Sequence, residues 1–164
     1  MRERGGVLLE TVMFTPVLLM LILGTAEIGR VTYTYAALHK ALYGLARYVG
    51  TQQGVNFCDD TDPTLVAAKN LAVTGTLDAS AQPTIGGLTV DMIQVRPERY
   101  NAATGELGAC DCSSSGCDAS QGGLPPDFIT VSLVSGYPIR PVFFGLSVDP
   151  IQLRPHVRVP FGGL

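Results

Sequence analysis

The chain has 164 residues, a net charge of −3 and a hydrophobic fraction of 46%. Its charge is uneven: residues 54–127 hold ten acidic side chains against three basic ones, whereas residues 128–164 hold three arginines against one aspartate. Nucleic-acid binding requires a basic face, so the acidic middle region argues against that role. The length that remains after the N-terminal apolar segment is enough for one small domain.

An apolar run of 20 residues, 7–26, dominates the N-terminal sequence. As a helix it would be roughly 30 Å long, about the thickness of a membrane's hydrocarbon core. Its one charged side chain is Glu10, and burying a lone carboxylate in lipid costs on the order of 2.5 kcal/mol or more. The carboxylate either reaches the cytoplasmic headgroups without a partner or serves a purpose inside the membrane. We interpret the run as a membrane anchor that also acts in assembly.

The flanking residues predict the orientation of this anchor. Arg2 and Arg4 precede the run, which favours a cytoplasmic N-terminus and an exported remainder. All four cysteines follow the run, and their even number fits an oxidising compartment in which they pair. We therefore expect a single-pass membrane protein with a cytoplasmic N-terminus and an exported C-terminal domain.

The helix is expected to continue beyond the membrane, to about residue 49 and a length of roughly 65 Å. Pro16 removes one backbone donor and can bend the membrane half. Past the apolar run, apolar residues recur at alternating spacings of three and four, which is typical of a helix packed lengthwise against a partner. That partner is either the chain's own domain or another subunit, and the row of apolar residues, here called the seam, is long enough to contact both. The seam consists of Ile28, Val31, Tyr35, Leu38, Leu42, Leu45 and Val49.

The first 50 residues resemble the TadE-like pilin proteins of tight-adherence, Flp-type pili. The residues that carry the resemblance are Arg4-Gly5, Glu10, Pro16, Glu27-x-Gly29-Arg30 and Ala46-Arg47-Tyr48. The resemblance implies that a prepilin peptidase removes a basic leader, residues 1–5, by cutting between Gly5 and Gly6. Glu10 then becomes the fifth residue of the mature protein, the position at which type IV prepilins carry a glutamate.

The same resemblance implies a minor pilin or pseudopilin that is anchored in the bacterial inner membrane and reaches a pilus or the cell surface after assembly. Its partners would be membrane lipid, the prepilin peptidase and other pilin subunits, contacted through the helix. Glu10 would pair with an amino group and fix the axial register, with Pro16, Glu27 and Arg30 as further assembly residues. Two rival functions remain open: a permanently anchored periplasmic binding module, and a secreted protein cut by signal peptidase after Ala26.

Beyond the helix, the sequence predicts a small α+β domain with an antiparallel sheet. Asp62 and Pro63 have the residue types of an N-cap and first position, for a short helix that ends near Gly75. Strands are predicted at 88–95, 128–134 and 151–159, and residues 96–127 are predicted to be a long loop. Pro155 cannot donate a ladder hydrogen bond, so the last strand should lie at an edge. The expected organisation is a leader at 1–5, the helix at 6–53 and the exported domain at 54–164.

Four cysteines, Cys58, Cys110, Cys112 and Cys117, are expected to staple the long loop. Three pairings are possible, and a bridge from Cys58 to the cluster would contribute roughly 4 kcal/mol. A metal site on the three clustered cysteines is disfavoured, because their spacing is unusual for zinc and no histidine is near. The acidic group around Asp60 lacks the glycine and glutamate of an EF-hand. We expect neither a metal nor a cofactor.

Enzymatic signatures are not found in the sequence. The two histidines, His39 and His156, belong to no Ser-His-Asp order and to no HExxH motif, and there is no phosphate-binding loop. The sequence therefore favours a non-enzymatic protein without a small-molecule substrate.

Overall fold

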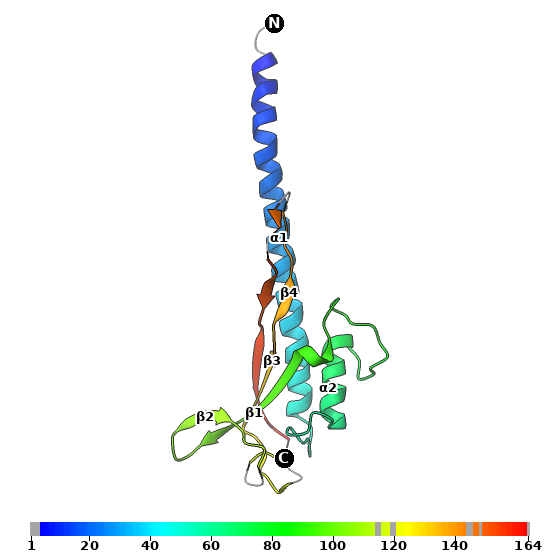
Figure 1. Ribbon diagram of the computed structural model, residues 1–164, viewed down its shortest axis with the longest axis vertical. Helices are drawn as coiled ribbons and strands as arrows, with labels where there is room; N and C mark the ends of the chain where they lie inside the picture. The colour runs from blue at the N-terminus through cyan, green and yellow to red at the C-terminus, as the bar shows by residue number, and fades with distance from the viewer. Residues whose placement is uncertain (1–3, 114–115, 119–120, 144–145, 148, 164) are drawn as a thin grey trace.

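The computed structural model describes residues 4–113, 116–118, 121–143, 146–147 and 149–163. One long helix, α1 (Arg4–Gly50), carries a small domain on its C-terminal half, and its N-terminal half projects away from that domain (Figure 1). The helix passes through Pro16 without ending. The predicted α+β class and the long continuous helix are both confirmed.

A second helix, α2 (Pro63–Thr74), packs against the C-terminal half of α1. The Asp62 carboxylate caps it by accepting hydrogen bonds from the backbone N–H groups of Thr64 (2.9 Å) and Leu65 (3.2 Å). Gly75 ends it in the left-handed region, with φ at 79°, where glycine is favoured. Both predicted ends of this helix are confirmed.

An antiparallel sheet with strand order β2-β1-β3-β8 packs on the same half of α1. Its strands are β1 (Ile93–Asn101), β2 (Glu106–Ala109), β3 (Phe128–Leu133) and β8 (His156–Pro160). The strand predicted at 88–95 was placed too early, because Val90–Met92 form a 3-10 turn, η1, and β1 extends to Asn101. The predicted loop at 96–127 was wrong in its first part, which holds the β1–β2 hairpin.

Pro97 explains why β1 was hard to recognise. Proline is disfavoured inside a central strand because it lacks an N–H donor. The Pro97 carbonyl accepts a hydrogen bond from Cys110 N (2.9 Å), just beyond the last β1–β2 pair. Since the N and O atoms of one residue face the same side in an antiparallel strand, Pro97 presents both to the β2 side. The missing donor therefore removes no hydrogen bond to β3.

β3 and β8 are also the base of a long hairpin that lies along α1 and extends towards its N-terminal half (Figure 1). Its upper pairs are β4 with β7 and β5 with β6, all antiparallel. These strands are β4 (Tyr137–Ile139), β5 (Val142–Phe143), β6 (Leu146–Ser147) and β7 (Ile151–Leu153). The strand predicted at 151–159 is divided at the buried Pro155 into β7 and β8. β8 lies at the edge of the sheet, as expected.

The core lies where α1, α2 and the inner face of the sheet meet. Five α1 side chains are fully buried there: Leu38, Leu42, Leu45, Ala46 and Val49. They meet Leu65 and Ala68 of α2 and the alternating residues Ile129 and Val131 of β3. After β8 the chain returns to the end of α1, where Gly162 N donates to the Gly50 carbonyl (2.9 Å). The C-terminal half of α1 is thus an integral part of the domain.

Candidate functional site

The N-terminal half of α1 presents an uncovered apolar surface. By length and composition, α1 is the one helix in the described part of the chain that can cross a membrane. Contiguous apolar surface of this extent is not stable in water, so lipid or other apolar helices must cover it. The exposed residues are Val7, Leu8, Leu9, Val12, Met13, Phe14, Val17, Leu18, Leu19, Met20, Leu21, Ile22 and Leu23.

Glu10 lies on this exposed surface. Its carboxylate forms no hydrogen bond or ion pair with any residue that the structure describes. Gly5 and Gly6, between which cleavage was predicted, lie in the first turns of α1. A carboxylate in an otherwise apolar helix is costly in lipid, so its side chain needs a partner that this chain does not provide within the described residues.

Two threonines next to Glu10 and Pro16 are adapted to an apolar surrounding. The Thr11 hydroxyl donates to the Val7 carbonyl (2.8 Å), and the Thr15 hydroxyl donates to the Thr11 carbonyl (2.6 Å). These bonds satisfy both hydroxyls inside the helix, which lowers the cost of placing them in lipid. Pro16 has no N–H, so the Val12 carbonyl lacks its usual helical donor.

Glu27 and Arg30, the other two predicted assembly residues, make contacts within the chain. The Arg30 guanidinium forms an ion pair with Glu27 (Nη2–Oε2 2.9 Å). The same Nη2 donates to the backbone carbonyl of Arg140 (2.6 Å), between β4 and β5. This pair of residues therefore fastens the upper part of the hairpin to α1, just beyond the apolar run.

The predicted apolar seam divides into two parts. Leu38, Leu42, Leu45 and Val49 are buried in the chain's own core. Of the upper seam residues, Val31 is half-buried, whereas Ile28 and Tyr35 are exposed. The chain's own domain occupies the lower seam, and the upper part remains available to another partner.

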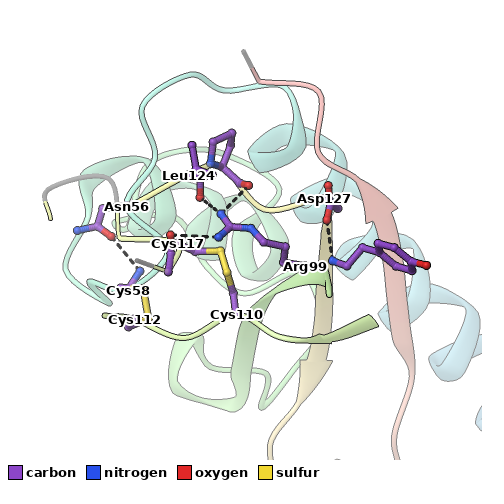
Figure 2. Close-up of a disulfide and its surroundings, with 11 residues drawn as sticks. Asn56, Cys58, Arg99, Cys110, Cys112, Cys117, Leu124 and Asp127 are labelled. Atoms are coloured by element: carbon purple, nitrogen blue, oxygen red, sulfur yellow. Dashed lines mark hydrogen bonds between the residues drawn. A yellow bond between two sulfur atoms is a disulfide. The ribbon is translucent and has the colours of Figure 1, made fainter. Parts of the chain in front are cut away.

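The cysteines form two disulfides beside the sheet. Cys58–Cys112 joins the segment after α1 to the segment after β2, and Cys110–Cys117 closes a short loop within the latter (Figure 2). A bridge from Cys58 to the cluster was one of the open alternatives in the sequence. The structure thereby gives the connectivity that spacing alone left undecided.

Arg99 organises the same loop, a role that the sequence reasoning missed. Its guanidinium donates to the carbonyls of Gly116 (3.3 Å), Leu124 and Pro125 (2.9 Å) (Figure 2). A signal was present in the sequence. Arg99 lies an even number of residues after Ile93 in β1, so its side chain is on the same face of the sheet as the buried Ile93. The loop has few apolar residues that could pack together, and the hydrogen bonds of Arg99 hold its backbone in place instead.

The acidic residues that follow α1 make hydrogen bonds and an ion pair within the domain. Asp59 accepts from the Thr61 hydroxyl (2.6 Å) and backbone N–H (2.9 Å), and these bonds, the hydroxyl first, lower the pKa of the Asp59 carboxyl. Asp60 pairs with Lys69 (3.1 Å), and Asp62 caps α2. Among the residues that the structure describes, no three His, Cys, Asp or Glu side chains are placed to hold a metal ion.

Comparison with protein families agrees with this geometry. Residues 5–47 match the family model described as TadE-like protein. The match covers almost all of α1 and stops before α2 and the sheet. The resemblance found in the sequence is confirmed for this segment. Searches of curated proteins and of solved structures gave no match.

Proposed function

Because α1 is a TadE-like segment, we propose that this chain is a non-catalytic pilin-like subunit, a minor pilin or pseudopilin, that acts in assembly of a tight-adherence pilus. The TadE-like match and the apolar helix indicate a membrane-anchored protein associated with such pili. The observation that carries the proposal is the division of α1. Its N-terminal half is exposed and apolar, whereas its C-terminal half is built into the domain's core. If α1 moves from lipid to the helices of a filament, the domain must therefore move with it.

In this proposal, a prepilin peptidase cuts between Gly5 and Gly6 at the cytoplasmic face of the inner membrane. Residues 1–5 are the leader, residues 6–53 contain the transmembrane and extended helix, which ends at Gly50, and residues 54–164 are the exported domain. The basic residues Arg2 and Arg4 before the apolar run support this orientation. The two disulfides also favour an exported domain, since disulfides persist in oxidising compartments.

Glu10 acts at the step in which a subunit leaves lipid and joins the helices of a filament. Its carboxylate would pair with an amino group, either the new N-terminus of the same mature chain or that of a neighbour. Such a pair offsets the cost of the buried charge and fixes how far one helix slides along another. The lack of a partner for Glu10 among the described residues supports a partner supplied at assembly.

A comparison of Glu10→Ala with Glu10→Asp tests this function. We expect Glu10→Ala to insert into the membrane normally but to fall by about tenfold or more in sheared pilus fractions, because an ion pair is lost. Glu10→Asp keeps the charge and should retain part of the incorporation. Thr15→Ala, roughly 8 Å further along the same apolar segment, is the control for a polar side chain without charge and should behave as the wild type.

Quantitative immunoblots of membrane and pilus fractions measure the outcome. If Glu10→Ala enters pili as well as the wild type does, the assembly role is rejected. The rival function, a permanently anchored binding module, predicts that none of these variants changes piliation.

A further inference from the structure

The upper end of the long hairpin lies beside the end of the apolar run. β5 contacts α1, and Arg30 binds the carbonyl of Arg140 just before β5 begins. From residue 140 to the end of β5 the strand advances roughly 10 Å, which equals about seven residues of helix. The β5–β6 pair therefore reaches the level of Leu23 on α1. Figure 1 shows the hairpin extending along α1 in this direction.

The exposure of α1 supports this placement. Leu23 is 37% exposed, whereas Ile22, one residue earlier and on another face, is 62% exposed. On the face of Leu23, Gly24, Glu27 and Val31 are also partly covered. These residues follow one another at helical spacing, and the same face continues to the buried Leu38. The hairpin thus lies against one face of the last turn of the apolar run.

That last turn is needed to cross the membrane. The apolar run has 20 residues, and crossing a hydrocarbon core takes about 20 residues at helical rise. A helix of this length cannot leave its final turn outside the lipid without shortening the span. Because the β5–β6 pair lies beside this turn, it must lie at the membrane surface as well.

The composition of the hairpin end suits that location. β5 and β6 consist of Val142, Phe143, Leu146 and Ser147, none of which is charged, and Arg140 and Asp149 flank the two strands in the sequence. Val142, on β5, is 70% exposed. Aromatic and aliphatic residues flanked by a cation are typical of segments that enter the boundary between headgroups and acyl chains. The β5 and β6 backbones pair with each other, which reduces the cost of placing them there.

We propose that the β5–β6 end of the hairpin is a second membrane-contact site, which enters the lipid interface beside the C-terminal end of the α1 span. The occupant of this surface is lipid rather than another protein, because the surface is continuous with the helix segment that lipid covers. Two attachment points would fix the tilt and the rotation of the domain on the membrane. This inference does not depend on pilus assembly or on the direction in which α1 crosses the membrane.

The chain contains no tryptophan, which permits a direct test. Val142→Trp is introduced into the full chain, which is reconstituted in phosphatidylcholine vesicles at less than one chain per vesicle. Quenching is measured with lipids brominated near the headgroup end of the acyl chain. Val134→Trp is the matched control, because Val134 is exposed on the same hairpin but lies roughly 25 Å further from the tip. Ile22→Trp, within the apolar run, is the positive control.

We expect the Val142→Trp fluorescence to be quenched at least about twofold more than that of Val134→Trp, and to approach that of Ile22→Trp. Equal quenching at positions 142 and 134 would overturn the proposal. Phe143→Trp exchanges one aromatic residue for another and provides a second reporter if Val142→Trp is unstable. Because the vesicles hold isolated chains, quenching at position 142 cannot arise from a neighbouring subunit.

Discussion

At the scale of single residues, neighbouring carboxylates have different structural roles. The Asp62 carboxylate accepts three backbone hydrogen bonds, from Asn56, Thr64 and Leu65. Asp60 makes one ion pair, to Lys69, with its own side chain 91% exposed. An ion pair at such a site is worth little, because water screens it. The acidic sequence at 59–62 therefore combines a helix cap with a weak surface contact.

Asp62→Ala tests the cap. We expect it to lower the free energy of unfolding by about 1 kcal/mol, since the first turn of α2 loses its acceptor. Asp60→Ala is the matched control and should change the free energy by less than about 0.5 kcal/mol. Urea unfolding of the full chain in detergent, followed by near-ultraviolet circular dichroism, measures both. Equal effects of the two changes would contradict the assigned roles.

At the scale of elements, the two disulfides constrain loops of very different length. Cys58–Cys112 spans 54 residues, whereas Cys110–Cys117 spans 7. A longer closed loop removes more conformational entropy from the unfolded chain. The first bridge also joins the segment after α1 to the segment after β2, whereas the second closes a short loop next to Arg99 (Figure 2). The longer bridge should therefore dominate the contribution to stability.

Replacing each pair by serine separates the two contributions. We expect the Cys58→Ser, Cys112→Ser double variant to lose about 4 kcal/mol and the Cys110→Ser, Cys117→Ser double variant about 2 kcal/mol. Thermal unfolding of the oxidised full chains provides the comparison, with the reduced wild type as the common reference. The reverse order of stability would show that loop length does not govern these bridges.

The elements also show what the sequence could reveal. α1 was predictable because its apolar run and its seam both repeat at helical spacing, and α2 because Asp62, Pro63 and Gly75 mark its ends. β3 was predictable from strict alternation, with Ile129 and Val131 inside. These signals are local, so no knowledge of the tertiary structure was required.

The errors arose where distant contacts decide the structure. β1 contains Pro97 and several charged residues. It is a strand because β2 and β3 pair with it and because the Asp127 carboxylate accepts a hydrogen bond from the Tyr100 N–H (2.7 Å). The strand predicted at 151–159 is divided at Pro155, although burial alternates through it, because the hairpin changes register beside Gly136. Disulfide pairing and the contacts of Arg30 likewise depend on segments far apart in the sequence. For Gly5, Gly6 and Glu10 the cleavage and assembly roles stay predictions.

At the scale of the whole molecule, α1 joins two environments within one continuous helix. Its first half requires lipid or partner helices, and its second half is part of a protein core. The hairpin runs along α1 between these two parts and is fastened to it by Arg30 (Figure 1). A displacement of the helix out of the membrane would therefore carry the domain with it. This arrangement suits a subunit that is transferred intact from the membrane into a filament.

The central claim is that the apolar helix remains part of the mature protein and loses only its leader. The N-terminal residue of the native protein, purified from membranes and determined by Edman sequencing and intact mass, tests this claim most directly. We predict a chain that begins at Gly6 and keeps Glu10 as its fifth residue. A chain that begins at Glu27 would show that the apolar run is discarded, and one that begins at Met1 would show that no leader is removed. Either result would contradict the proposed maturation.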